Sequence, residues 1–313
     1  MSVSIFIDGA AGTTGIEIRE RLADRKDVSL ILLDDARRKD AAARAEALND
    51  ADVVILCLPD DAAREAVSLI RNDRTKVIDA STAHRVDPTW TYGFAELEPD
   101  GRERLAEAKR VSNPGCYPTG FLALVRPLVR AGMLPADWPL SVNATSGYSG
   151  GGKAMIAAFE DPDSPDATDT AFRIYGLNLA HKHVPEMATH AGLSVAPIFL
   201  PAVTHTVRGM IVEVPLHLHA LPGRPDIASI RGLIAESYQG SAVVQVDEGE
   251  HALLRIEDVA GTDLLRLHVF GNPAMGQARL VALLDNLGKG ASGAAVQNLN
   301  LMAGLGETVG LQL

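Results

Sequence analysis

Residues 3–23 read VSIFIDGAAGTTGIEIRERLA, and this stretch decides the fold of the first part of the chain. The run VSIFID is apolar and β-branched, as in a buried strand, and TGIEIRERLA has the apolar spacing of a helix. Three glycines stand where the strand passes into the helix: Gly9 permits a tight turn, Gly12 lets the backbone approach a pyrophosphate, and Gly15 allows close helix–strand packing. The helix N-terminus then presents backbone N–H groups to phosphates. A turn that serves packing alone is the alternative, but we predict a dinucleotide site contacted by Gly9, Ala11, Gly12, Thr13, Thr14 and Gly15.

The pattern repeats through the first third of the chain. Apolar strand candidates at 29–35, 51–59 and 76–81 alternate with helix candidates at 14–23, 40–50 and 60–72. Short, wholly apolar strands separated by helices are typical of a parallel sheet that is covered on both faces. With right-handed crossovers, this predicts an α/β, doubly wound Rossmann-type nucleotide domain.

The end of the second strand bears on the choice between NAD and NADP. An acidic residue there binds a ribose hydroxyl, whereas arginine accepts a 2′-phosphate. Asp34 and Asp35 are followed by Arg37, Arg38 and Lys39, so both signals are present. Such a run of cations is often no more than a solvated loop. We nevertheless predict NADP(H), with Arg37 and Arg38 binding its 2′-phosphate.

The pattern changes after about residue 118. Longer, more alternating strands are predicted at 193–203, 209–220, 241–248 and 264–272, with a helix at 226–239. Residues 277–305 read as two helical stretches split by Gly-Lys-Gly. This mixture predicts a second, α+β domain with a mixed sheet.

Composition limits the function classes. The 313 residues are 47% hydrophobic and 22% charged, as in an ordinary globular protein. A net charge of −11 disfavours nucleic acid as a partner. There is no basic leader and no apolar run near the roughly 20 residues that span a bilayer, so we expect no membrane association. Two cysteines without paired spacing favour a reducing, cytoplasmic compartment.

One of these cysteines stands in a conspicuous place. Cys116 lies in NPGCYPT, between a predicted strand at 109–114 and an apolar helix. The positive end of a helix favours the nucleophilic thiolate, so we predict an acylation nucleophile there, against the alternative of a small packed residue. Cys57 lies inside an apolar strand and is expected to be inert.

Candidates for acid–base chemistry follow later. HKHVPE puts His181, His183 and Glu186 within six residues, and a carboxylate can fix a histidine tautomer. These side chains could also ligate zinc, but there is no HExxH or CxxC pattern, so we expect no metal. Further candidates are His205, which could equally be structural, Arg208 as an anion clamp, and the glycine-rich loop 145–153 with Lys153.

Taken together, DGAAGTTG (8–15), SNPGCYPT (112–119), TSGYSGGGK (145–153), HKHVPE (181–186) and GKGASGAAVQNLNLM (288–302) resemble the shorter branch of the N-acetyl-gamma-glutamyl-phosphate reductase family. The resemblance covers essentially the whole chain. It implies that Cys116 is the nucleophile, that the histidines of HKHVPE are the acid–base region, and that Glu186 supports them. It implies an NADP-binding domain formed by 1–117 and about 290–313, and a substrate-binding, catalytic and dimerisation domain at 118–289. The cofactor set then extends to Ser81, Ser146, Gly147 and Asn298, and the expected substrate contacts are Asn113, Ser149, Lys153, His205 and Arg208.

The resemblance also implies a reaction. N-acetyl-L-glutamyl 5-phosphate would be reduced with NADPH to N-acetyl-L-glutamate 5-semialdehyde and phosphate in arginine biosynthesis. The nucleophile would form a thioester, and the protein would act as a homo-oligomer, a dimer or tetramer. Three alternatives stay open at this point: a related acyl-phosphate reductase such as aspartate-semialdehyde dehydrogenase, a cysteine hydrolase, and an NADP-binding sensor without turnover.

Overall fold

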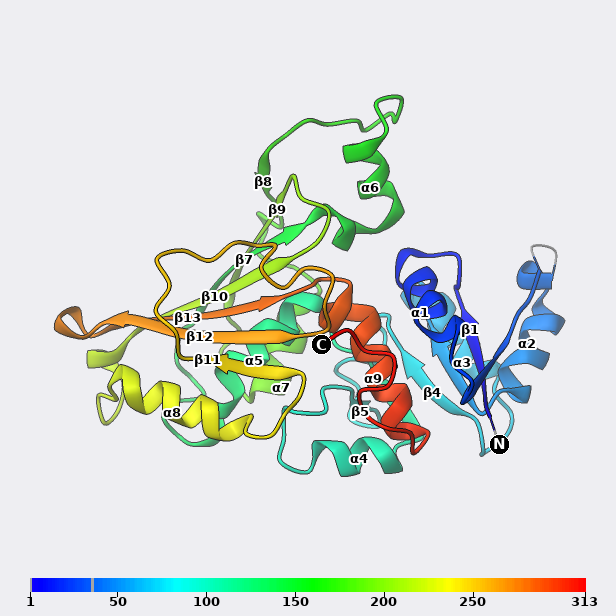
Figure 1. Ribbon diagram of the computed structural model, residues 1–313, viewed down its shortest axis with the longest axis horizontal. Coiled ribbons are helices and arrows are strands. Elements are labelled where there is room, and N and C mark those ends of the chain that lie inside the picture. The colour runs from blue at the N-terminus through cyan, green and yellow to red at the C-terminus, as the bar shows by residue number, and fades with distance from the viewer. Residues whose placement is uncertain (1, 35–36) are drawn as a thin grey trace. The chain divides into compact units, whose positions relative to one another are not determined.

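Six strands form a wholly parallel sheet in the first of two units into which the chain divides, Met1–Gly115 with Ala291–Leu311 (Figure 1). The computed structural model describes residues 2–34 and 37–313. The strand order is β2-β1-β3-β4-β6-β5. The elements are β1 (Val3–Asp8), α1 (Thr13–Ala23), β2 (Val28–Ile31), α2 (Ala41–Asp50), β3 (Val53–Leu56), α3 (Asp60–Leu69), β4 (Lys76–Asp79), β5 (Thr91–Tyr92), α4 (Gly101–Glu107), β6 (Arg110–Ser112) and α9 (Gly293–Met302).

Alternate residues of these strands enter two separate cores, because successive strand side chains point to opposite faces of the sheet. Ile5 and Ile55 pack with residues of α1, α4 and α9 on one face. Phe6 and Val54 pack with α2 and α3 on the other. The predicted doubly wound arrangement is confirmed.

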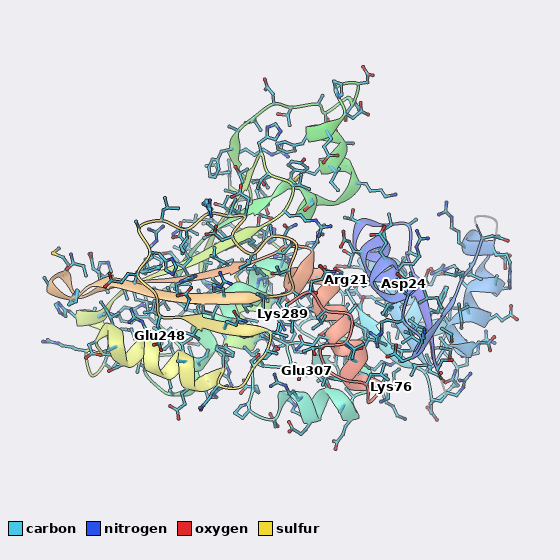
Figure 2. All side chains as sticks on the ribbon, viewed as in Figure 1. Arg21, Asp24, Lys76, Glu248, Lys289 and Glu307 are labelled. Atoms are coloured by element: carbon cyan, nitrogen blue, oxygen red, sulfur yellow. The ribbon has the colours of Figure 1, made fainter. Side chains whose placement is uncertain are left out.

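Helix α9 comes from the end of the chain but belongs to this unit. Lys76 Nζ donates to the carbonyl of Met302 at 2.6 Å, and Arg102 Nε donates to Glu307 at 2.9 Å. Figure 2 labels Lys76, at the C-terminal end of α9, and Glu307, which also accepts from Gln297 in the middle of that helix. These contacts hold the C-terminal segment in the unit that carries the first glycine turn.

The second unit, Cys116–Gly290 with Gln312–Leu313, contains a seven-stranded mixed sheet of order β11-β12-β13-β10-β7-β9-β8. The pairs β7–β9 and β11–β12 are parallel, and the other pairs are antiparallel. Its elements are α5 (Cys116–Arg130), β7 (Ser141–Gly147), α6 (Gly152–Glu160), β8 (Phe172–Ile174), α7 (His183–Ala191), β9 (Ile198–Thr204), β10 (Met210–His217), α8 (Ile227–Ser237), β11 (Val244–Asp247), β12 (Leu265–Asn272) and β13 (Gln277–Leu284).

Helix α5 is the centre of this unit and packs on the sheet, with α7 and α8 beside it. It approaches β10 so closely that a Cβ on Gly120 would lie 2.8 Å from a methyl carbon of Val212. The mixed-sheet second domain predicted from the sequence is confirmed.

Some element boundaries were predicted wrongly. The first of the two helical stretches expected in 277–305 is strand β13, followed by a π-helical turn at Gly288–Ser292. An apolar run of this length suits a buried strand as well as a helix, and its central place between β10 and β12 decides the outcome. The strands expected at 29–35 and 193–203 are β2, which ends at Ile31, and β9, which begins only at Ile198. Across the described residues, no helix combines the length and apolarity needed to cross a membrane.

Candidate active site

Cys116 is the first residue of the 15-residue helix α5 and is partly exposed. Gly290 lies directly beside it: a Cβ there would stand 2.9 Å from Cys116 Cβ and 2.9 Å from the carbonyl oxygen of Asp285. Only glycine leaves room for the sulfur-bearing side chain at this point. The predicted place of the thiol, at a helix N-terminus, is therefore what the fold provides.

Two tyrosines and two histidines surround the start of α5. Tyr117 donates to the carbonyl of Ala202 at 3.2 Å and accepts from Tyr175 at 3.0 Å. Its ring lies 6.2 Å from His181 and 5.8 Å from His183, and the two imidazoles lie 4.7 Å apart. The HKHVPE histidines thus lie against Tyr117, the residue next to Cys116. The tyrosines were missed, although Tyr117 adjoins the cysteine in sequence.

The hydrogen bonding of His181 assigns its tautomer. The backbone N–H of His183 donates to His181 Nδ1 at 3.1 Å, so that nitrogen carries a lone pair and the neutral ring has its proton on Nε2. Burial and the neighbouring Lys182 charge both lower the pKa of His181. His181 is therefore set up to present an N–H donor at neutral pH.

Electrostatics link the tyrosines to the thiol. Burial raises the pKa of Tyr175 to about 12, and the Cys116 charge contributes to the rise. Burial also raises the pKa of Tyr117, with contributions from Tyr175 and Cys116. Both phenols therefore stay protonated at neutral pH, close to Cys116.

His183 and Glu186 lie in the first turn of α7, and both are buried. Glu186 is 1% exposed, which is rare for a carboxylate unless partners compensate for its lost hydration. The support of the histidines by Glu186 stays a prediction.

The second glycine loop is held rigidly by the segment that follows β13. Asn286 donates from Nδ2 to Ser149 Oγ at 2.8 Å and accepts at Oδ1 from the backbone N–H of Gly209 at 3.0 Å. Ser146 and Ser149 are both buried. A Cβ on Gly147 would lie 2.7 Å from the carbonyl of Val207, so this strand end also requires glycine.

Arg208 faces a buried acid that the sequence did not single out. Its guanidinium lies 3.8 Å from Asp285, which is 0% exposed and accepts from the backbone N–H groups of Leu287 and Gly288. Asp285 and Asn286 directly follow strand β13. They were missed because the sequence of this strand predicts a helix.

Two predicted substrate residues lie apart from these contacts. His205 is exposed, and its ring packs against Phe159 at 5.3 Å and Tyr148 at 6.1 Å. Lys153 is exposed in the first turn of α6. Neither has a contact with the cysteine cluster among the described residues.

The first unit carries the dinucleotide signals. Gly9 has φ +90° and its missing Cβ would collide with the carbonyl of Cys57, while a Cβ on Gly15 would lie 2.5 Å from the carbonyl of Gly9. Thr13 begins α1, and its buried Oγ1 has no hydrogen-bond partner among the described residues. A glycine cradle with an unsatisfied hydroxyl at a helix N-terminus fits a pyrophosphate. The predicted members Ala11, Gly12 and Thr14 lie in the same turn and the start of α1.

A cavity of about 480 Å³ adjoins this turn, and its cationic lining comes from Arg19, Arg38 and Arg44. Arg44 pairs with Asp8 at 2.8 Å, and both side chains are largely buried. The exposed Arg37 pairs with Glu46 at 3.1 Å. Arg19 and Arg44 were missed because each sits inside a helix pattern. Asp35 lies outside the described residues, as does the side chain of Lys39.

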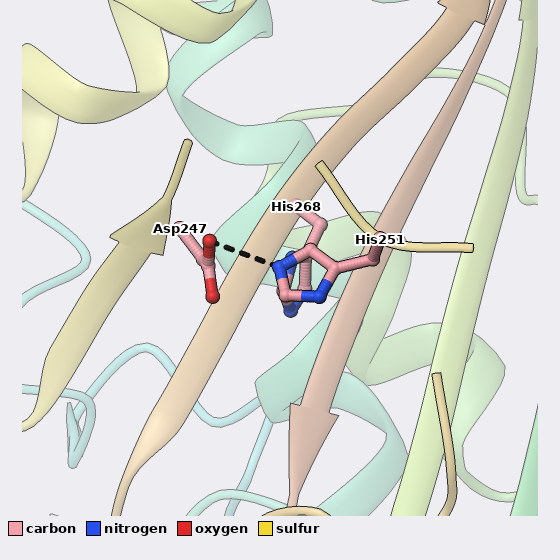
Figure 3. Close-up of side chains that lie close together, drawn as sticks. All are labelled: Asp247, His251 and His268. Atoms are coloured by element: carbon pink, nitrogen blue, oxygen red, sulfur yellow. Dashed lines mark hydrogen bonds and ion pairs between the residues drawn. The ribbon is translucent and has the colours of Figure 1, made fainter. Parts of the chain in front are cut away.

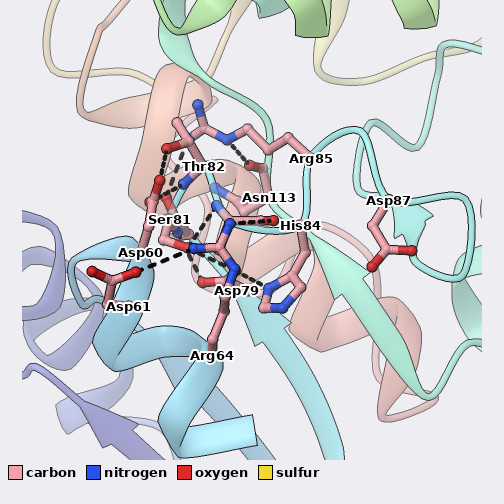
Figure 4. A network of polar contacts seen from close by, with 12 residues as sticks. Asp60, Asp61, Arg64, Asp79, Ser81, Thr82, His84, Arg85, Asp87 and Asn113 are labelled. Carbon is pink, nitrogen blue, oxygen red and sulfur yellow. Dashed lines mark hydrogen bonds and ion pairs between the residues drawn. The ribbon is translucent and has the colours of Figure 1, made fainter.

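Polar side chains at the carboxyl ends of β4 and β6 form one network (Figure 4). Asp79 is fully buried and accepts from Ser81 Oγ at 2.8 Å, and it lies 2.6 Å from His84 Nδ1. Asn113 accepts at Oδ1 from Asn298 Nδ2 at 3.0 Å. Asn298 Oδ1 is buried with no partner in the described part of the chain, which fits a polar cofactor group. Asn113, predicted as a substrate contact, is thus bonded to a predicted cofactor residue.

A parallel-sheet unit with a dinucleotide cradle, and a mixed-sheet unit with a cysteine among histidines, define a semialdehyde dehydrogenase. Comparison agrees: residues 4–105 match "Semialdehyde dehydrogenase, NAD binding domain" and residues 116–286 match "Semialdehyde dehydrogenase, dimerisation domain". Aspartate semialdehyde dehydrogenase II from Vibrio cholerae has a TM-score of 0.72 at 17% identity, over 97% of this chain and 99% of that chain. The Francisella tularensis enzyme gives 0.71 at 14%, over 96% and 100%. These two likenesses concern the fold.

Sequence relatives give the finer assignment. The N-acetyl-gamma-glutamyl-phosphate reductases of Brucella ovis and Brucella melitensis biotype 2 are each 55% identical over 309 residues, which is 97% of this chain and 100% of theirs. The chain belongs to the N-acetyl-gamma-glutamyl-phosphate reductase family, an oxidoreductase family with a nicotinamide-nucleotide domain. The resemblance inferred from the motifs is confirmed.

Proposed function

We propose that this protein reduces N-acetyl-L-glutamyl 5-phosphate with NADPH to N-acetyl-L-glutamate 5-semialdehyde, releasing phosphate, as a step of arginine biosynthesis. The observation that carries the proposal is Cys116 at the N-terminus of α5, with His181, His183 and two protonated tyrosines around it. The family membership supplies the substrate and the pathway. A nucleotide-binding sensor would not need this cluster.

Cys116 is the proposed nucleophile. The positive end of α5 favours its thiolate, which attacks the acyl-phosphate carbon. The resulting oxyanion takes hydrogen bonds from backbone N–H groups at the start of α5 and from His181 Nε2–H. Phosphate then leaves with the bonding electron pair and needs no strong acid, since an acyl phosphate is already activated.

His181 is the proposed hydrogen-bond donor to the substrate oxygen in both half-reactions. Its Nδ1 is engaged by the backbone of His183, so Nε2–H is the group that can donate to an oxygen on the substrate carbon. The ring of His183 packs against His181 with centroids 4.7 Å apart, and Glu186 is buried on the same helix. We therefore assign stabilisation of the substrate oxyanion to His181 and orientation of its ring to His183 and Glu186.

The cofactor residues are proposed from the cradle and its cavity. Gly9, Gly12 and Gly15 with Thr13 hold the pyrophosphate, and Arg38 and Arg44 beside the cavity accept the 2′-phosphate of NADP(H). Arg37 is a weaker candidate because it is not among the residues that line this cavity. When bound, the nicotinamide supplies the hydride that reduces the thioester. The remaining proposed contacts to the cofactor are Ser81, Ser146, Gly147 and Asn298.

We assign substrate recognition to Arg208 and Ser149. Arg208 lies beside Asp285, and Ser149 accepts a hydrogen bond from Asn286. Arg208 is the cation for the substrate's carboxylate or phosphate. Asn113, Lys153 and His205 remain proposed contacts of lower weight, because the first is committed to structural bonds and the other two are exposed.

We propose that two copies associate through the sheet of the second unit. The edge strand β8 and its neighbour β9 expose large apolar side chains: Phe172 is 54% exposed, Ile174 63% and Ile198 52%. Apolar patches of this kind mark protein interfaces, and the matched family is described as a dimerisation domain. Light scattering would give a dimer or larger, and Ile174→Glu would shift it toward the monomer. We also place the protein in the cytoplasm, where a catalytic thiol stays reduced.

The test runs the reaction in reverse and follows nicotinamide absorbance. N-acetyl-glutamate semialdehyde, phosphate and NADP are mixed with wild type, with Cys116→Ala and with Cys57→Ala as the matched control. We expect phosphate-dependent reduction of NADP in wild type and Cys57→Ala, and none in Cys116→Ala. Turnover with aspartate semialdehyde instead would keep the chemistry and reject the substrate. Activity surviving in Cys116→Ala would reject the mechanism.

A further inference from the structure

A second cluster of histidines lies away from the cysteine, on the β11–β12 side of the mixed sheet (Figure 3). Asp247 ends β11, and His268 is its direct partner in the parallel register of β12. His251 comes from the segment after β11. One ligand atom from each of the three residues lies within 4.8 Å of the others.

His268 is the unusual member of the cluster. The residue is 1% exposed, yet neither ring nitrogen has a hydrogen-bond partner among the described residues. A buried imidazole without partners costs free energy that folding normally avoids. The ring instead stacks on Phe270 at 5.6 Å and meets the edge of His251 at 5.1 Å. It is therefore held in place with its polar atoms unsatisfied.

The spacing of the other two residues suits a shared ion. His251 Nε2 lies 3.1 Å from Asp247 Oδ1. Neighbouring ligands bonded at about 2.0–2.1 Å in a tetrahedral or octahedral site stand roughly 2.9–3.4 Å apart. Asp247 is also fixed by the backbone N–H of Gly249, which donates to Oδ1 at 2.7 Å, so its carboxylate has little freedom.

The donor set decides the class of ion. Two imidazoles and one carboxylate suit zinc and its borderline neighbours, whereas magnesium and calcium prefer oxygen ligands throughout. His251 also lines a cavity of about 520 Å³. Burial lowers the pKa of His268; among the nearby charges, Arg266 lowers this pKa further and Asp258 raises it.

We propose that Asp247, His251 and His268 form a zinc site that fastens the segment after β11 to the face of the mixed sheet. In the sequence, only HKHVPE suggests a metal site, and the missing HExxH and CxxC patterns predict none there. Asp247 and His251 stand four residues apart, but the third ligand joins them only through the pairing of β11 with β12.

The experiment measures binding of Zn²⁺ to the purified protein, first stripped with a chelator, by calorimetry and by metal content after gel filtration. Wild type is compared with Asp247→Asn, with His251→Ala and with His217→Ala, an exposed histidine of the same unit. We expect one zinc per chain in wild type and His217→Ala, and at least tenfold weaker binding in the other two. Zinc should raise the thermal midpoint of wild type and His217→Ala only.

A cobalt spectrum and the binding by the variants together show whether zinc occupies this site. Cobalt substitution should give a visible d–d band in wild type that His251→Ala removes, and His251 is exposed enough for that variant to fold. Binding that is unchanged in Asp247→Asn and His251→Ala would place zinc elsewhere, such as at the cysteine or His181 and His183. Either that result or the absence of zinc binding overturns the proposal.

Discussion

Gly290→Ala is a small change that tests how tightly the reactive cysteine is placed. The new Cβ would stand 2.9 Å from both Cys116 Cβ and the carbonyl oxygen of Asp285. Gly290 does not have a positive φ, so the backbone accepts alanine and the collision is the only perturbation. Carbon atoms in contact sit at about 3.5–4.0 Å, so something must move by about 0.6–1 Å.

The cysteine is the part that must give way. The carbonyl of Asp285 accepts from Gly290 N–H at 3.0 Å, and the Asp285 side chain is held by Leu287 and Gly288. A misplacement near 1 Å in an active site costs up to about 10²-fold in rate, so we expect kcat to fall by about 10–100-fold. Overpacking should also lower the free energy of unfolding by about 1–3 kcal/mol.

The assay is the phosphate-dependent reduction of NADP, together with the rate of Cys116 alkylation and the thermal midpoint. The control is Gly232→Ala on α8, where a Cβ meets nothing within 4 Å. That variant should keep wild-type kcat and gain up to about 1 kcal/mol of stability, as alanine does over glycine inside a helix. Unchanged turnover in Gly290→Ala would show that the close approach to Cys116 does not constrain the thiol.

Three further results are expected. Because burial and Lys182 lower the pKa of His181 below its usual 6.5, the acid limb of the pH–kcat profile should lie below that value, and Lys182→Gln should move the limb to higher pH. The lowered pKa also means that the unfolded state holds the proton more tightly, so the free energy of unfolding should fall as the pH drops below 6.5. At pH 8 a thiol reagent should label Cys116 alone by intact mass, since burial raises the pKa of Cys57 to about 12, and denaturant should expose the second site. Asn298→Ala removes two buried hydrogen bonds in the first unit and should lower unfolding free energy by about 1–3 kcal/mol in urea melts.

The first unit was predictable because its signals are local. The glycine turn, the wholly apolar strands and the amphipathic helices each lie within about 20 residues, and together they specify a parallel sheet. The cysteine turn was predictable for the same reason. Strand β13 was not, because QARLVALL is buried on both faces at the centre of a sheet and has lost the alternation that marks a strand.

Contacts between distant segments were invisible to local patterns. Arg44 reaches Asp8 across 36 residues, and it reads in sequence as an ordinary polar position of α2. Asn286 reaches Ser149 across 137 residues, after a strand that was assigned as helix. In both cases the residue type was unremarkable, and only the sheet topology gives it a neighbour. When a central strand is predicted as a helix, the residues that follow it are therefore not recognised as candidate site residues.

The surroundings of the two cysteine sulfurs differ, although the two residues belong to the same partly exposed class. Cys57 follows β3, and burial of its thiol together with the carboxylates of Asp79 and Asp8 raises its pKa to about 12, which disfavours the thiolate. Cys116 instead opens α5, whose N-terminal end favours a negative charge. The proposal that Cys116 is the nucleophile therefore rests on the helix that follows β6 and not on the residue type alone.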